Sequence, residues 1–378
     1  MAKPEPIPVF KPCYDEEEVQ AVAEVLRSGW IGLGPRTRQF EHAFAGYVEA
    51  PFAVATNSAT AALHLALKVA NVEGHEVITT PMTFVSTNHA ILYNNGIPVF
   101  ADIEPDTLNV DVRSVEELLS PRTRAIVVVH YGGHACDMDA IMELARLRGI
   151  PVIEDAAHAC GAQYKGKRIG GLGNLTCFSF HAVKNLATGD GGMITCTDPQ
   201  VAERLDHLRW VGISKDTWRR AGEETRYSWF YGVEDVGFKY HMNDIAAALG
   251  LVQLAKLDRT NARRREIVAR YNQGFAGLEW LETPVEKPYA HSSWHNYVVK
   301  AERRDELIQF LGERGISAGM HYYPNHLYEI YEPYRRPLPV TDRVWRRLVT
   351  LPLFPDLTDS QVEHIIETVR SFGAQRLT

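Results

Sequence analysis

Several features that would assign this chain to a specialised class are absent from its 378 residues. The five cysteines form no Cys-x-x-Cys pair and are odd in number, which is typical of reduced thiols rather than of a disulfide framework or a zinc site. No run of about 18 apolar residues occurs, so no transmembrane helix is expected, and residues 1–6 lack the apolar stretch of a signal peptide. We therefore expect a cytoplasmic protein with no membrane partner.

Charge and motifs exclude further classes. The net charge is −7 and no run of Lys or Arg is present, which argues against a nucleic-acid partner. The segment 170–173, Gly-Gly-Leu-Gly, does not follow an expected strand and so does not predict a dinucleotide site, and the sequence has neither a P-loop nor a Gly-x-Ser-x-Gly motif. The histidines at 130, 134, 158 and 181 are too scattered to predict a metal site. We expect no metal.

The composition is that of an ordinary globular protein, with 45% apolar and 23% charged residues. A chain of this length is too long for one small core. We expect a large N-terminal domain over residues 1–255, N-terminal segment included, and a smaller α/β domain over residues 256–378. No flexible linker marks the boundary.

Between residues 50 and 200, short apolar runs alternate with helix-like segments. Strands are predicted at residues 76–80, 98–101, 125–130, 151–154, 176–180 and 192–196, and helices lie among them at 61–69 and 138–148. This alternation predicts an α/β fold with a mostly parallel sheet that is covered on both faces.

Further elements are predicted on either side of this region. Apolar residues share one face of a helix expected at 16–26: Val19, Val22, Ala23 and Leu26. Later segments are expected to be helices at 243–256, 261–271, 305–314 and 359–371, and a strand at 294–299.

Two residues with chemical potential fall at the same edge of the predicted sheet. Asp155 follows the strand 151–154 and Lys184 follows the strand 176–180, and ligands of parallel sheets bind beyond the carboxyl ends of the strands. A lysine amine can form a Schiff base with the aldehyde of pyridoxal phosphate and later act as an acid and base. A buried carboxylate keeps the cofactor's pyridine nitrogen protonated, which makes the ring an electron sink. A lone lysine is usually a surface charge, and a lone aspartate at a strand end often caps a helix. The prediction of a pyridoxal phosphate site therefore rests on the two residues together.

Other residues suit the rest of such a cofactor. The segment 56–63, which contains Ser58, places small and hydroxyl residues before an apolar helix. This pattern is typical of a phosphate site at a helix start and also of a simple helix cap by Ser58. Ser179 adds a hydroxyl, Phe84 is a candidate to stack on the ring, and His158 is a candidate to pack against the ring or bond its phenolic oxygen. An isolated aromatic or histidine at either position would more often be structural. Glu154 should point away from Asp155 if the strand alternates.

At these residues the chain resembles the DegT family of pyridoxal phosphate sugar aminotransferases. The resemblance runs nearly end to end and is carried by segments 28–35, 57–61, 121–131, 154–159, 179–185 and 351–355. It implies the fold type I (aspartate aminotransferase-like) architecture, a homodimer, glutamate and 2-oxoglutarate as amino donor and its product, and a nucleotide-linked keto-sugar as acceptor. The Gly-Trp-Ile start at 29–31 and the Gly-Phe-Lys-Tyr run at 237–240 are most like members that make UDP-4-amino-4-deoxy-L-arabinose.

The resemblance also implies roles for individual residues. Lys184 matches the Schiff-base lysine and Asp155 the partner of the pyridine nitrogen. Phosphate and ring contacts match Ala59, Thr60, Ser179 and Phe84. Lys239 stands where many members have an asparagine that reaches the phosphate of the neighbouring subunit, and a histidine at 158 resembles members that aminate sugar C4.

The chain departs from the family pattern at two places. Residues 209–212, Arg-Trp-Val-Gly, replace a common Asn-His-Gly, so that Val211 stands in place of the histidine, and the segment Ser214–Gly232 has no evident counterpart. The segment 320–326, with His321 and Tyr322, resembles a substrate-facing segment, although a structural role fits equally well.

Other functions remain open from the sequence. Amination at C3, or of a keto-inositol, would use the same residues, and a non-catalytic regulator that only binds the cofactor is the alternative outside enzymology. Sugar dehydratases of this fold replace the lysine with histidine, whereas this chain keeps Lys184.

Overall fold

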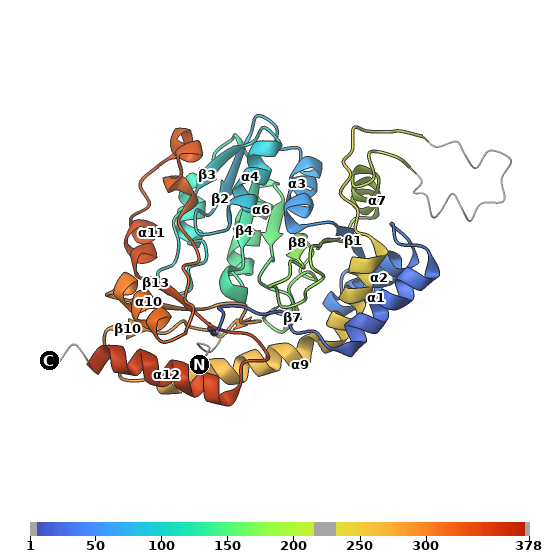
Figure 1. Ribbon diagram of the computed structural model, residues 1–378. Coiled ribbons are helices and arrows are strands. Elements are labelled where there is room, and N and C mark those ends of the chain that lie inside the picture. The colour runs from blue at the N-terminus through green and yellow to red at the C-terminus, as the bar shows by residue number, and fades with distance from the viewer. Residues whose placement is uncertain (1–5, 215–231, 375–378) are drawn as a thin grey trace.

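A seven-stranded sheet forms the centre of the computed structural model, which describes residues 6–214 and 232–374 (Figure 1). The unusual segment noted above therefore lies, apart from its two end residues, outside the described part. In spatial order the strands are β1 (Phe52–Thr56), β9 (Gly192–Cys196), β8 (Leu175–Ser179), β5 (Val152–Asp155), β4 (Thr123–Val129), β2 (Glu76–Thr79) and β3 (Ile97–Phe100).

The sheet is mostly parallel, as the sequence predicts. Only β9 runs antiparallel to its two neighbours, β1 and β8, and the other pairings are parallel. The six predicted strands are all present, with ends displaced by at most two residues. The carboxyl ends of β5 and β8 consequently lie side by side.

Both faces of the sheet are buried, because successive side chains of a strand point to opposite sides. In β4, Ile126 and Val128 join one apolar core and Ala125 and Val127 join the other. The first core is packed by α2 (Pro35–Val48), α6 (Met138–Arg148) and the first half of α9 (Asp244–Gly274). The second is packed by α3 (Ala59–Val69), α4 (Val85–Tyr93) and α7 (Pro199–Leu208).

A smaller α/β region follows α9. Its sheet contains β10 (Leu281–Glu282), β12 (Tyr297–Ala301) and β13 (Leu348–Leu351), packed by α10 (Arg304–Glu313) and α12 (Asp359–Ala374). The described residues also form α5 (Val112–Leu118), α11 (Pro339–Val344) and the 3-10 helices η1 (Tyr131–Gly133), η2 (Asn325–Leu327), η3 (Glu329–Tyr334) and η4 (Trp345–Arg347). A third sheet contains β11 (Ala290–His291), β6 (Gln163–Tyr164) and β7 (Lys167–Arg168).

The prediction of two separate helices at 243–256 and 261–271 is wrong, because α9 is one continuous helix from Asp244 to Gly274. No glycine or proline interrupts residues 257–260, and Leu257 and Asn261 are buried on the same helix. The helix contributes Leu257 to the large core and Tyr271 to the core of the small region. The predicted boundary at 255/256 falls inside this shared helix, and the division into two domains stays a prediction.

The first helix, α1 (Glu16–Ser28), forms where it was predicted, but its apolar face is not in the core. Val19 and Leu26 are 59% and 56% exposed, whereas Glu18 and Val25 are buried. Glu18 is held there by the ammonium group of Lys256, 3.0 Å away on α9. This ion pair explains why the expected inward face points outward.

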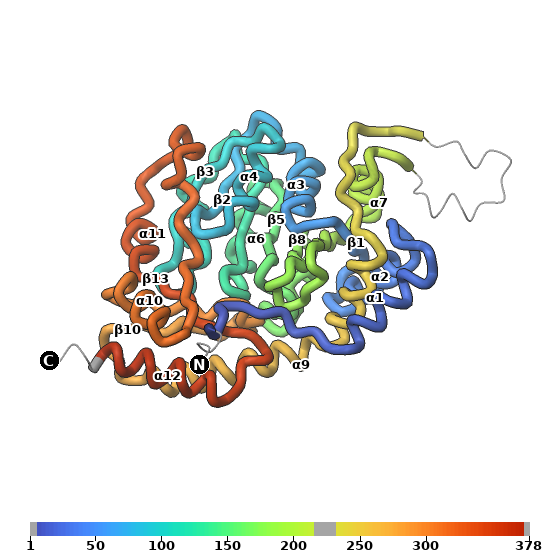
Figure 2. The backbone as a smooth tube through the Cα atoms, in the orientation of Figure 1, coloured from blue at the N-terminus to red at the C-terminus, as the bar shows by residue number. Residues whose placement is uncertain are grey.

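The described N-terminal residues run across the molecule to the C-terminal region, as Figure 2 shows. Ile7 forms a parallel bridge with Ile316, and the backbone carbonyl of Val9 accepts a hydrogen bond from Leu353. This path carries Phe10 to the carboxyl edge of the large sheet, where it meets the residues of the cavity described below.

No helix of the described residues is long and apolar enough to cross a membrane.

Candidate active site

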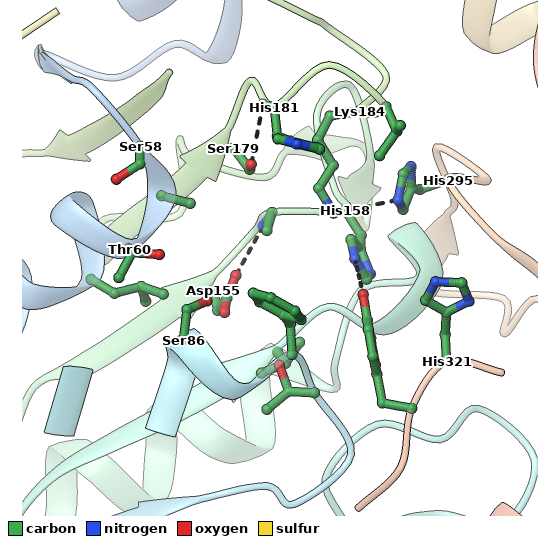
Figure 3. Close-up of a pocket in the computed structure, with 18 of the residues that line it drawn as sticks. Ser58, Thr60, Ser86, Asp155, His158, Ser179, His181, Lys184, His295 and His321 are labelled. Carbon is green, nitrogen blue, oxygen red and sulfur yellow. Dashed lines mark hydrogen bonds between the residues drawn. The ribbon is translucent and has the colours of Figure 1, made fainter. Parts of the chain in front are cut away.

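A cavity of about 360 Å³ opens beyond the carboxyl ends of β5 and β8. Seven of the eight predicted site residues line it: Ala59, Thr60, Phe84, Asp155, His158, Ser179 and Lys184. Figure 3 shows Lys184, Asp155 and Ser179 directed into the same space, with Thr60 at the side of α3. The eighth, Lys239, is not part of this lining.

The start of α3 provides an anion site on one wall. Ser58 caps the helix in an extended conformation, and its hydroxyl oxygen accepts a hydrogen bond from the Ala61 amide at 3.1 Å. The free backbone N–H groups and the dipole of a helix start favour a phosphate. Strand β9 passes so close that a Cβ on Gly192 would lie 2.5 Å from the Ser58 carbonyl oxygen. Glycine at 192 therefore allows β9 to support this turn.

Asp155 is the last residue of β5 and is only 3% exposed. Its carboxylate accepts hydrogen bonds from the Thr87 hydroxyl at 2.6 Å and from the Ala157 amide at 3.0 Å. Burial raises the pKa of this carboxyl against the opposing effect of those hydrogen bonds and of Lys184. A cation placed in the cavity would stabilise the ionised form.

Glu154 points to the opposite face, as strand alternation requires. Its carboxylate contacts His130 at 2.8 Å and accepts a hydrogen bond from the Asn174 amide at 2.7 Å. Both Glu154 and His130 are fully buried. Glu154 is therefore a structural group, and Asp155 is the carboxylate that faces the cavity.

Lys184 lies in the turn after β8, where its amide donates to the carbonyl of His181. Lys184 is partly exposed and lines the cavity. Burial lowers the pKa of Lys184 to about 8, although Asp155 attracts its proton. A much larger fraction of such an amine is unprotonated near neutral pH than of an ordinary lysine, which makes it a better nucleophile.

His158 is held as a neutral imidazole. Its Nδ1 accepts a hydrogen bond from the Gly132 amide at 3.3 Å, so Nε2 carries the proton and donates to the Tyr322 oxygen at 3.0 Å. Burial and the charge of Lys184 lower the pKa of His158 well below its ordinary value. The ring is thus available to pack against a bound ring without adding charge.

Phe84 immediately precedes α4 and is 59% exposed at the cavity. Its ring centroid lies 6.3 Å from that of Tyr322. An apolar ring that is left this exposed within a cavity suits contact with a ligand.

Lys239 lies elsewhere in this chain. Its ammonium group sits 3.3 Å above the Trp210 ring, and its backbone carbonyl accepts a hydrogen bond from the side chain of Asn57. Asn57 adjoins the start of α3. The contact of Lys239 with the phosphate of a neighbouring subunit stays a prediction.

Arg209 and Val211, from the segment 209–212, have different surroundings. Arg209 is fully buried and forms ion pairs with Glu41 and Asp206. Val211 adopts a left-handed backbone conformation (φ 51°) and does not line the cavity.

The sequence did not identify Phe10 and His295, which line the cavity, or the role of Thr87. The amino group of Lys184 lies 3.5 Å from Nε2 of His295, and Phe10 stacks on the histidine ring at 5.1 Å. Neither residue lies near a recognisable motif, and His295 is 111 positions from Lys184. His321 and Tyr322, from the segment flagged in the sequence, also line the cavity.

The residues present fit pyridoxal phosphate. A lysine amine of lowered pKa, a buried carboxyl group, an anion-binding helix start and an exposed aromatic ring converge on one space. These groups match the aldehyde, the pyridine nitrogen, the phosphate and the ring face of that cofactor. Within residues 6–214 and 232–374, no group of three or more His, Cys, Asp or Glu side chains is arranged to hold a metal ion.

Comparisons with known proteins agree with this site. The model of the DegT/DnrJ/EryC1/StrS aminotransferase family matches residues 12–370. The spore coat polysaccharide biosynthesis protein SpsC of Bacillus subtilis is 43% identical over 376 residues, which cover 96% of each chain.

Solved structures are similar over nearly the whole chain. The sugar aminotransferase CalS13 from Micromonospora echinospora has a TM-score of 0.90 and 33% identity, with 97% of this chain and 99% of that chain covered. Spr1654 from Streptococcus pneumoniae in its PLP-form has a TM-score of 0.91 and 33% identity, with 99% and 100% covered.

Proposed function

Because the chain belongs to the DegT/DnrJ/EryC1/StrS aminotransferase family and is a pyridoxal phosphate-dependent sugar aminotransferase of fold type I, we propose that it transfers the amino group of glutamate to a nucleotide-linked keto-sugar, at C4. The products are 2-oxoglutarate and a nucleotide-linked 4-amino sugar.

The observation that carries this proposal is the meeting of Lys184 and Asp155 in one cavity with the start of α3. Pyridoxal phosphate, when bound, supplies an aldehyde that condenses with amines and a ring that accepts electrons. Lys184 would hold the cofactor through its amine and, as the free amine, would move a proton as acid and base. Asp155 keeps the ring nitrogen protonated, while Ala59, Thr60 and Ser179 hold the phosphate.

The choice of C4 rests on His158, which resembles the histidine of members that aminate this position. The choice of a nucleotide-linked sugar rests on the family resemblance, with SpsC named for polysaccharide biosynthesis. The cytoplasm is the proposed location, since all five cysteines are free thiols.

We also propose a homodimer. The outward face of α1 and the segment after it expose apolar side chains in the single chain: Val19 is 59%, Leu26 56% and Ile31 50% exposed. Exposed apolar groups of this kind suit a contact with a second copy. In that dimer, Lys239 of one subunit reaches the phosphate bound by the other.

A half-reaction screen tests the proposal. The protein is loaded with pyridoxal phosphate, converted with glutamate, and offered UDP-, dTDP- and GDP-linked 3-keto and 4-keto sugars while the cofactor absorbance is followed. We expect glutamate to shift the absorbance and one 4-keto nucleotide sugar to restore it. The Lys184→Ala variant serves as the control that should not complete the amino transfer from glutamate or to a keto-sugar.

Other outcomes would replace the proposal. Restoration by a 3-keto sugar would move the reaction to C3. A glutamate response with no response to any nucleotide sugar would redirect the search to keto-inositols. No glutamate response with intact cofactor would indicate a protein that binds the cofactor without transferring an amino group.

A further inference from the structure

His295 is held rigidly beside Lys184 by groups from several parts of the chain. It is 2% exposed and lies just before β12. Phe10 stacks on its ring with planes 5° apart, and the His158 ring lies at 4.4 Å with planes 34° apart. With rings packed against it in this way, the imidazole has little freedom to turn.

The hydrogen bonds of Asn185 determine which nitrogen of His295 carries the proton. The Asn185 amide nitrogen donates to the side-chain oxygen of Asn261 and to the carbonyl of Ser293, both at 2.8 Å. The amide oxygen of Asn185 therefore faces Nδ1 of His295, 3.0 Å away, and can only accept. Nδ1 must carry the hydrogen, which leaves a lone pair on Nε2 of a neutral ring.

That lone pair faces Lys184. The Nε2 atom lies 3.5 Å from the lysine amino nitrogen, and Figure 3 shows this contact on the His295 side of the cavity. An amino group can donate to a neutral imidazole nitrogen whether it is an amine or an ammonium, but the bond is stronger from the ammonium form.

We propose that His295 is a positioning residue for Lys184: its Nε2 accepts a hydrogen bond from the lysine amine, aims that amine, and sets how readily it takes and releases a proton. This inference rests on the proposed role of Lys184 as the reacting amine. Asn185, Asn261 and Ser293 act behind His295 by fixing its tautomer.

The surrounding charges favour a neutral His295. Burial, and then the positive charges of Lys184 and Arg264, lower the pKa of His295 well below its ordinary value, with His158 and His321 acting in the same direction. The negative charge of Asp155 acts to raise the pKa of Lys184. His158 and His321 themselves have lowered pKa values beside Lys184.

The consequence is measurable on the protein without cofactor. Losing an acceptor that favours the ammonium form should lower the pKa of Lys184, so that at a fixed pH below that pKa the fraction of free amine rises, up to about tenfold for a change of one in the pKa. His295→Phe keeps a ring but offers no acceptor. His295→Gln replaces the ring but can place an amide oxygen near the position of Nε2.

Competitive labelling of Lys184 with an amine-specific reagent, read by peptide mass spectrometry from pH 6 to 11, gives the lysine pKa directly. We expect the pKa to fall in His295→Phe and to return towards the wild-type value in His295→Gln. His321→Phe, which alters the same cavity at a residue with no hydrogen bond to the lysine amine, should leave the value unchanged. An unchanged pKa in His295→Phe, or the same fall in all three variants, would overturn the proposal.

A second measurement does not depend on any His295 variant folding. Nitrogen-15 spectra of histidine-labelled wild-type protein, with the His295 signals assigned through the contact of its ring with the Phe10 ring, should show a protonated Nδ1 and a bare Nε2. A protonated Nε2 would refute the inference. Both measurements use protein without cofactor, so they test the role of His295 even if the aminotransferase screen fails. Conversely, an unchanged pKa of Lys184 in His295→Phe would not affect the result of that screen.

Discussion

Replacing Asp155 with asparagine should stabilise the protein without cofactor and destabilise its complex with pyridoxal phosphate. The pKa of Asp155 is raised above its ordinary value of 3.8 by burial. The folded protein therefore holds this proton to a higher pH than the unfolded chain does. Ionisation of Asp155 costs folding free energy that begins above about pH 4 and grows until the folded-state pKa is passed.

The asparagine side chain can keep the existing hydrogen bonds. Its oxygen can accept from the Ala157 amide, and its amide nitrogen can donate to the Thr87 hydroxyl, which then turns its own hydrogen towards Thr83, 2.8 Å away. Removing one buried charge while these bonds remain should stabilise the apoprotein by about 1–3 kcal/mol. That corresponds to a rise of about 2–6 °C in Tm.

The gain should depend on pH through Lys184, whose pKa is about 8. Below that pH Lys184 is protonated, and the variant removes the anion that stabilises its charge. Neutralising the lysine at pH 7 costs about 1.4 kcal/mol of folding free energy. The stabilisation by Asp155→Asn is therefore smaller at pH 7. At pH 8.5 the lysine is mostly neutral and the gain is fully expressed. Near pH 4 the difference between variant and wild type should vanish.

Thermal unfolding of both proteins from pH 4 to 8.5, with and without saturating cofactor, provides the assay. Cofactor should raise the Tm of the wild type more than that of the variant. Stabilisation by a ligand grows with the logarithm of the ratio of its concentration to its dissociation constant, and the variant is expected to bind the cofactor more weakly. Glu154→Gln is the matched control: it replaces the neighbouring carboxylate, which holds buried His130 and Asn174, and should lose stability. An Asp155→Asn apoprotein less stable than wild type at pH 8.5 would refute the reasoning.

Three further predictions concern the buried Arg209, the phosphate site and Lys239. Arg209→Met should cost about 3–5 kcal/mol, because it leaves the buried carboxylate of Glu41 with weaker compensation; an unchanged Tm would contradict this. Thr60→Val should weaken cofactor binding about tenfold if its hydroxyl donates to the phosphate, as equilibrium dialysis would measure, and equal affinity would exclude that contact. Lys239→Gln should weaken cofactor binding in a dimer and leave it unchanged in a protein shown by sedimentation to be monomeric; unaltered affinity in a dimer would remove Lys239 from the site.

The parts of the fold that follow from periodicity could be predicted from the sequence. β5 and β8 were predicted from short segments that contain apolar residues, Val-Ile and Leu-Thr-Cys-Phe, and their parallel pairing places Asp155 and Lys184 at one edge. Strand alternation predicted that Glu154 and Asp155 point to opposite faces, as they do. The outward face of α1 did not follow, because burial of Glu18 depends on Lys256, an ion pair between residues 238 positions apart.

The rest of the site depends on contacts that leave no local pattern. His295 and Phe10 reach Lys184 only through the packing of the N-terminal segment and the small region against the large sheet. Helix α9 was predicted as two helices although no glycine or proline stands at residues 257–260, and the buried Leu257 and Asn261 lie on one continuous helix. The contact of Lys239 with a neighbouring site concerns a second chain.

Borohydride reduction of the cofactor-loaded protein, followed by peptide mapping, tests the central claim most directly. The claim is that Lys184 carries the cofactor and yields it to glutamate. The account predicts one modified lysine, at position 184, and loss of that modification when glutamate is added before reduction. Modification of a different lysine, or a Lys184 adduct that glutamate leaves unchanged, would contradict it.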